Sequence, residues 1–159
     1  MGAKGEALAK QFEAKAQEAT AVMEKLSDAD WKKVTAAEKW SVAVTAHHVA
    51  MAHEGIAGII KTVASGQSIP NFTMDMLNEM NAKHATEFAG VTKADTVALH
   101  KKNAAAAAAV VRGLNDDQLA KSGKVLAEAP PMSAEQIVTG ILINHIDDHY
   151  GSIRKTVGA

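Results

Sequence analysis

The chain has 159 residues, of which 47% are hydrophobic and 22% are charged, and these proportions are typical of a soluble globular protein. We therefore expect residues 1–159 to form a single domain. The formal net charge is −1 and no basic run stands out, which argues against a nucleic acid or an anionic membrane as a partner. The absence of cysteine excludes disulfides, thiolate metal ligands and a cysteine nucleophile.

The hydropathy of the chain predicts neither a membrane span nor an export signal. No apolar run approaches the roughly 20 residues that cross a bilayer. The N-terminal residues are polar and lead into a charged helix, without the apolar stretch of a signal peptide. We therefore expect a cytoplasmic protein.

Long stretches of helix-forming residues, interrupted by only three prolines, predict an all-α chain. Strand patterns are nearly absent. Ser41 and Thr73 are candidate N-caps, and Ser133 opens a capping box with Gln136. The longer predicted helices cover about 5–26, 41–64, 73–88, 92–113 and 133–157. The simplest arrangement is a four-helix bundle with one or two short accessory helices in its connections.

Two histidines in the last predicted helix are the first candidates for a functional site. His145 and His149 are four residues apart, so they project from the same helical face and can share one ion. They belong to a stripe of residues that we expect to face the bundle interior: Val138, Ile141, Leu142, His145, His149 and Ile153.

A third histidine, His48, lies on a similar predicted stripe of the second long helix. That stripe consists of Val44, His48, Met51, Ala52, Gly55 and Ile59. If His48 faces the other two, three neutral imidazoles surround a divalent metal and leave coordination positions for water or substrate. The alternatives are that these histidines are hydrogen-bonded core residues, or that His47 is the ligand in place of His48.

The remaining polar candidates have lesser predicted roles. His53, His84 and His100 are expected at the surface or its boundary, with a small chance that His84 lines a pocket. The candidate hydrogen-bond partners of the ligating histidines are Asn144, Asp147, Asp148 and Glu54. Of these, Asp147 is expected to be solvated. A group of apolar side chains is expected either to fill the core or to line a substrate pocket: Met51, Phe72, Met74, Met76 and Met80. Glu54, Asp148 and His84 are the candidates for a general base.

Two motifs around these histidines resemble those of the DinB/YfiT-like superfamily of metal-dependent enzymes. The first is Trp40-Ser41, followed eight residues after the tryptophan by His48 and then by an aliphatic residue. The second is His145-x-x-x-His149, followed by Tyr150-Gly151-Ser152-Ile153. The resemblance covers the whole chain and implies an up-down-down-up four-helix bundle. One departure is Val44, which stands where relatives often carry a carboxylate four residues before the ligand.

The resemblance also implies a function. The ligands would be His48, His145 and His149, and the ion Ni²⁺, Zn²⁺ or another divalent metal. The metal would lower the pKa of bound water or of a bound thiol. Relatives include thiol-dependent transferases and isomerases that use bacillithiol or mycothiol, and homodimers are common among them. We therefore expect a metal-dependent hydrolase or thiol transferase acting on a small molecule. The alternatives are a metal-binding or stress-associated protein without turnover, and a purely structural bundle.

Overall fold

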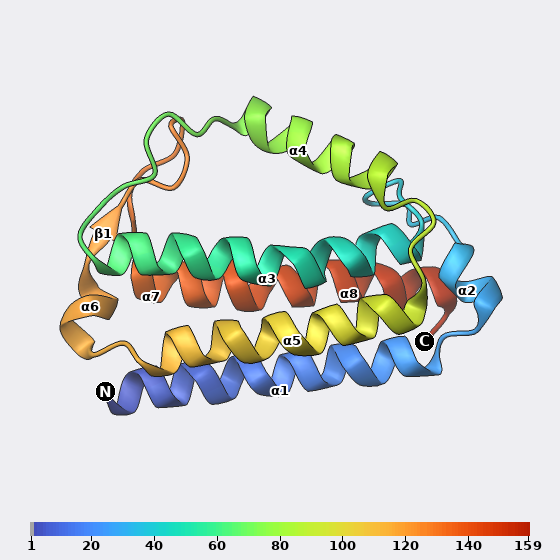
Figure 1. The fold of residues 1–159 in the computed structure, drawn as a ribbon, viewed down its shortest axis with the longest axis horizontal. Coiled ribbons are helices and arrows are strands. Elements are labelled where there is room, and N and C mark those ends of the chain that lie inside the picture. The colour runs from blue at the N-terminus through green and yellow to red at the C-terminus, as the bar shows by residue number, and fades with distance from the viewer. Residues whose placement is uncertain (1) are drawn as a thin grey trace.

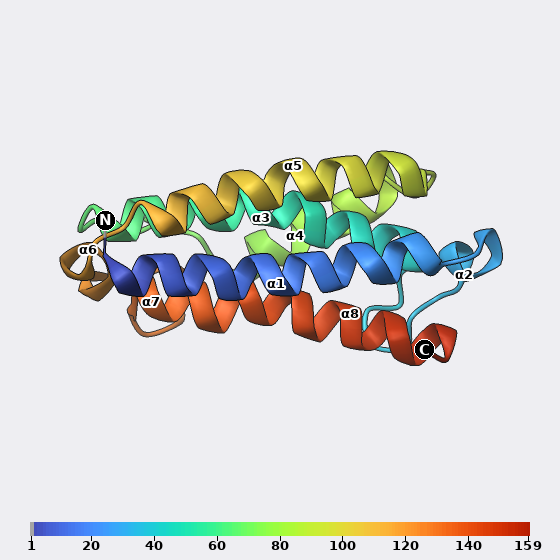
Figure 2. The same cartoon turned by 90° about the horizontal axis from the view of Figure 1, so that it is seen from below.

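The protein is a bundle of four long helices in the computed structural model, which describes residues 2–159 (Figure 1). The long helices are α1 (Ala3–Lys25), α3 (Val42–Ala64), α5 (Lys93–Arg112) and a C-terminal helix made of α7 (Ala134–Ile137), η1 (Val138–Ile143) and α8 (Asn144–Val157). Followed in chain order, α3 and α5 run opposite to α1, and the C-terminal helix runs parallel to α1 (Figures 1 and 2). The predicted all-α, up-down-down-up bundle is therefore confirmed.

Short elements fill the connections between the long helices. These elements are α2 (Asp28–Lys32), α4 (Met74–Glu87), α6 (Asp116–Ala120), β1 (Ser122–Gly123) and β2 (Met132–Ser133). The two strands pair antiparallel, with Ser122 opposite Ser133 and Gly123 opposite Met132. Gly123 is required there, because a Cβ atom at this position would lie 2.5 Å from the carbonyl oxygen of Gln67. Short helices in the connections were predicted, and α2 and α6 are two of them.

The predicted N-caps are confirmed. Ser41 accepts a hydrogen bond from the Val44 N–H, and Thr73 accepts one from Met76. Ser133 and Gln136 form the expected capping box. These local bonds satisfy backbone donors that have no partner inside the helix.

The core lies where α5 packs against both α1 and α3. Half of the alanine run on α5 is buried, at Ala104, Ala107 and Ala108. Small side chains let the helix backbones approach closely, and Phe12 and Met23 of α1 fill the remaining space with no exposed surface. No helix within residues 2–159 has both the length and the apolar character that a membrane span requires.

A π-helical segment, η1, changes the register of the C-terminal helix just before the histidine pair. The extra residue in each π turn rotates the following helix relative to a continuous α-helix. After η1 the buried positions are Ile146, Tyr150 and Ile153. Val138, Leu142 and Ile153 of the predicted stripe are buried, whereas His145 and His149 lie beside this line and are partly exposed.

The predicted stripe on α3 is also displaced. Met51 is 42% exposed and Gly55 is exposed, whereas the buried face runs through Val49, His53 and Ile56. This face is set by the packing of α3 against α5 and α8 on two sides. His48 consequently lies at the edge of the buried face and is partly exposed.

Helix α4 contributes nothing to the buried core. It contains no buried residue, and Figure 1 shows it standing apart from the bundle alongside α3. Met74, Met76 and Met80 are 44–58% exposed. The predictions that these methionines fill the core or line a core pocket are therefore wrong.

Candidate metal centre

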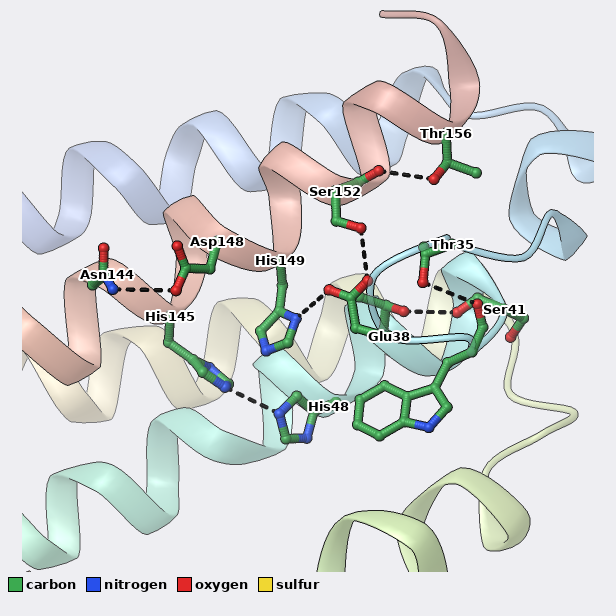
Figure 3. Close-up of polar contacts among 12 residues, drawn as sticks. Thr35, Glu38, Ser41, His48, Asn144, His145, Asp148, His149, Ser152 and Thr156 are labelled. Carbon is green, nitrogen blue, oxygen red and sulfur yellow. Dashed lines mark hydrogen bonds and ion pairs between the residues drawn. The ribbon is translucent and has the colours of Figure 1, made fainter. Parts of the chain in front are cut away.

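The structure brings His48 of α3 together with His145 and His149 of α8. One ring nitrogen from each lies within 4.8 Å of those from the other two (Figure 3). The Nε2 atoms of His48 and His145 are 3.0 Å apart, and the three ring centroids are separated by 4.5–5.0 Å. All three side chains are partly exposed, so the group lies within reach of solvent molecules.

The Trp40-Ser41 motif sets the position of His48. Ser41 caps the first turn of α3, which fixes where the helix begins and which face His48 occupies. The Trp40 ring packs edge-on against the His48 ring at a centroid distance of 5.2 Å. The motif residues therefore have a direct structural link to this histidine.

Burial keeps two of the three imidazoles neutral. It lowers the pKa of His48 to about 3, with further contributions from neighbouring imidazoles, and the pKa of His145 to about 4. Near neutral pH each ring therefore offers a free lone pair, as a metal ligand must.

His149 is oriented by a carboxylate that was not anticipated from the sequence. Its Nδ1–H donates to Oε2 of Glu38 at 2.6 Å, which leaves Nε2 free to face the other histidines (Figure 3). The Ser152 hydroxyl donates to the second carboxylate oxygen, also at 2.6 Å. Burial raises the pKa of Glu38, but the hydrogen bonds from Ser152, His149 and Thr35 outweigh it, so the pKa is lowered and the carboxylate stays ionised.

Glu38 lies in the turn before α3, and no spacing rule connects it to a residue on the last helix. The acids beside the histidine pair, in contrast, point elsewhere. Asp147 pairs with Lys15 at 3.0 Å, and Asp148 accepts a hydrogen bond from Asn144 at 3.2 Å. Glu54, the remaining sequence candidate, is exposed. The prediction that Asn144, Asp148 or Glu54 would bond the ligating histidines is wrong, because residues next to a ligand in a helix lie on different faces.

His47 does not join the three histidines. Its Nδ1 lies 2.8 Å from Nε2 of His84, and its ring stacks on Phe88 at 4.2 Å. These contacts tie the C-terminal end of α4 to α3. The His84 ring is 5.7 Å from the His48 ring, so α4 also brings His84 to the edge of the site.

The predicted locations of His53 and His100 are wrong. Both were expected at the surface or its boundary, and both are fully buried. Their ring nitrogens lie 3.2 Å apart, across α3 and α5. Helical periodicity alone does not distinguish a buried, hydrogen-bonded histidine from a surface one.

The donor set fits a divalent metal ion. Three imidazoles on two helices, one of them held by a carboxylate through its other nitrogen, form a ligand group suited to ions such as Zn²⁺ or Ni²⁺. Three protein ligands leave room in the coordination sphere for a further molecule.

Residues 11–153 match the model of the DinB superfamily. The chain belongs to the DinB superfamily. None of the curated proteins matches it.

Several solved structures share the fold. The mycothiol-dependent maleylpyruvate isomerase has 14% sequence identity and a TM-score of 0.73, over 94% of this chain and 60% of the isomerase. This DinB chain therefore spans about three fifths of the length of that enzyme. YfiT from Bacillus subtilis, described as a probable metal-dependent hydrolase with an unusual four-helix bundle topology, has 17% identity and a TM-score of 0.70, over 98% of this chain and 86% of YfiT.

Proposed function

We propose that this DinB protein is a metal-dependent enzyme that acts on a small molecule. His48, His145 and His149 would hold one divalent ion, with Ni²⁺ or Zn²⁺ as the best candidates. The observation that carries the proposal is the convergence of three ring nitrogens within 4.8 Å, with His149 held by Glu38.

The reaction that we propose is either the hydrolysis of a small molecule or a transfer to a small molecule that depends on a low-molecular-weight thiol. A bound divalent ion supplies Lewis-acid activation of a nucleophile near neutral pH. The two similar structures, one of a mycothiol-dependent isomerase and one of a probable metal-dependent hydrolase, support these two reaction classes. We further propose that the protein is cytoplasmic and forms homodimers.

The protein side chains would have separate tasks in this scheme. Glu38 and Ser152 keep the His149 proton on Nδ1, so that Nε2 remains available as a ligand atom. Among the general-base candidates, Glu54 is exposed and Asp148 is exposed and bonded to Asn144. His84 lies at the edge of the three-histidine group, so we propose that it contacts the substrate.

The proposal is tested first by elemental analysis of protein purified without a chelator. The wild type and the His48→Ala, His145→Ala and His149→Ala variants are compared with His47→Ala, whose histidine neighbours the group but does not belong to it. We expect about one equivalent of metal in the wild type and in His47→Ala, and loss of metal in the three ligand variants. Full metal occupancy in His145→Ala would contradict the ligand assignment.

The metal-loaded protein is then assayed against panels of ester and amide substrates, and against thiol-transfer substrates with added low-molecular-weight thiols. Turnover that disappears in His149→Ala supports the enzyme proposal. The panel in which the turnover occurs separates the two reaction classes. Stoichiometric metal without turnover in either panel would instead favour a non-catalytic metal-binding protein.

A further inference from the structure

Helix α4 directs one side at α3, and that side leads away from the three-histidine group. The ring of His84 contacts the rings of both His47 and His48, so α4 approaches α3 on the side of these two residues. The residues that share a face with His84 at helical spacing are less exposed than most of α4. These residues are Leu77, Asn81 and the C-cap Phe88. We call this face the inner side of α4.

Helices α3 and α4 run in opposite directions, so the first half of α4 lies alongside the middle of α3 (Figure 1). Leu77 comes seven residues before His84, and Gly55 comes seven residues after His48. At a rise of about 1.5 Å per residue, each is about 10 Å along its helix from the histidine. Leu77 therefore stands over the part of α3 that contains Gly55.

The side of α3 that faces α4 is apolar and open. Met51 follows His47 by four residues and His48 by three, so it lies on the same side of α3, and it is 42% exposed. Gly55 is one further turn along. Among residues 2–159, no atom outside this stretch of α3 lies within 4 Å of the position that a Cβ of Gly55 would take. The space above Gly55 is therefore free for another molecule.

The inner side of α4 is apolar at the same level. Leu77 is partly exposed, and Met74, three residues before it, is 44% exposed. Apolar side chains that stay exposed on two facing elements mark a surface that binds a ligand. Four uncharged residues form this α3–α4 surface: Met51 and Gly55 of α3, and Met74 and Leu77 of α4.

The position of the α3–α4 surface decides which kind of molecule fits it. It is continuous with the candidate metal centre, because Met51 is one helical turn from His48. Helix α4 stands over it, so a broad protein face cannot lie flat on α3 there, whereas a slender chain can (Figure 1). From His48 to Gly55 the surface extends about 10 Å, which accommodates a chain of several carbon atoms.

We propose that the substrate of the metal centre carries an uncharged hydrocarbon chain, which lies on the α3–α4 surface while the reactive group meets the metal. This inference rests on the proposed function. The flexible thioether side chains of Met51 and Met74 can adapt to such a chain. Gly55 leaves the space that a larger side chain would occupy.

The test measures the binding of alkyl hydroxamates to the Zn²⁺-loaded protein by isothermal titration calorimetry. The hydroxamate group binds zinc, and the length of the alkyl chain is varied from acetohydroxamate to octanohydroxamate. We expect the affinity of the wild type to rise by about two- to fourfold for each added methylene, because each methylene leaves water for an apolar surface.

Two variants should remove this dependence on chain length. Gly55→Glu places a charged side chain in the open space, and it should fold because Gly55 is exposed and Glu favours a helix more than Gly does. Met51→Gln replaces a thioether with an amide of similar length. In both variants the affinity for acetohydroxamate should stay close to that of the wild type.

Met80→Gln is the matched control for Met51→Gln. Met80 is 58% exposed and lies outside the inner side of α4. The control should therefore retain the full dependence on chain length. Equal losses in Met51→Gln and Met80→Gln would overturn the inference.

Other outcomes separate this inference from the proposed function. A Zn²⁺-loaded wild type that binds no long-chain hydroxamate, or binds all chain lengths equally, would overturn the inference alone. A wild type that holds no Zn²⁺ would refute the proposed function, and the inference would fall with it. If Met51→Gln dissociates a dimer in sedimentation experiments but keeps the dependence on chain length, a second copy covers the surface and the inference is wrong.

Methyl NMR of the Zn²⁺-loaded protein with ¹³C-labelled methionine locates the chain directly. Octanohydroxamate should shift the methyl signals of Met51 and Met74, whereas acetohydroxamate should not shift that of Met74. The signal of Met80 should stay in place with both probes. Shifts confined to methionines outside the α3–α4 surface would overturn the inference.

Discussion

Glu38 and His149 are joined by a 2.6 Å hydrogen bond although they are 111 residues apart in the chain. Both side chains are largely buried, with 9% and 18% of their surfaces exposed. The bond connects the turn before α3 to α8, and it sets which nitrogen of His149 faces the other histidines. The geometry of the candidate metal centre therefore depends on a loop as well as on two helices.

Replacement of Glu38 should weaken metal binding without unfolding the bundle. We expect Glu38→Ala to reduce Zn²⁺ affinity by about 10- to 100-fold, because His149 loses the group that fixes its tautomer. Glu38→Gln retains an acceptor oxygen and should have a smaller effect. The measurement is a Zn²⁺ titration by competition, with Glu54→Ala as a control for loss of an exposed carboxylate. A normal affinity in Glu38→Ala would show that the contact does not support the site.

Acid should destabilise the metal-free protein. Burial lowers the pKa of His48 and His53 to about 3 and that of His145 to about 4, from 6.5. Between these values the unfolded chain binds more protons than the folded chain, so the free energy of unfolding decreases as the pH falls below 6.5. The lowered pKa of Glu38 adds a further loss when this carboxylate is protonated in stronger acid.

The measurement is urea unfolding of the metal-free protein over a pH series from about 8 to about 4. Stability that stays constant down to about pH 5 would contradict burial of neutral histidines. The Zn²⁺-loaded protein should lose its metal at the acid end of this series and below, because in the folded chain protons compete with the ion for the rings of His48 and His145 near pKa values of about 3 and 4.

Core and surface apolar residues should respond differently to truncation. Phe12 has no exposed surface and contacts His53, so Phe12→Ala should lower the free energy of unfolding by about 3–5 kcal/mol. Met80 is 58% exposed on α4, and Met80→Ala should change it by no more than about 0.5 kcal/mol. Chemical denaturation checks both. A large loss in Met80→Ala would show that α4 is packed more tightly than the structure describes.

Helix α4 should exchange its amide hydrogens faster than α3. It has no buried residue. Its hydrogen bonds to other segments of the described chain lie near its ends, between Met74 and Glu128 and between His84 and His47. Few buried contacts allow a segment to open locally without unfolding the core. Hydrogen exchange followed by mass spectrometry measures this, and His84→Ala should increase exchange in α4 while leaving α3 unchanged. Equal protection of α3 and α4 in the wild type would contradict the prediction.

Local sequence signals determined the helices and part of the candidate site. The caps at Ser41, Thr73 and Ser133 act on backbone groups within a few residues, so their positions can be predicted from the chain alone. The pairing of His145 with His149 is equally local, because a four-residue spacing places both on one helical face. The prediction that His48 joins them came from periodicity, which left His47 as an alternative, and the resemblance to a known family implied the same ligand.

Tertiary packing decided the rest. The π segment before His145 and the two-sided packing of α3 changed which residues are buried, and a regular 3.6-residue pattern does not include either effect. Glu38 reaches His149, and His53 reaches His100, across segments with no fixed sequence spacing. The sequence by itself determined which residues share a helix face, because that depends on backbone geometry. Only the tertiary structure decided which faces meet, because that depends on how the four helices pack.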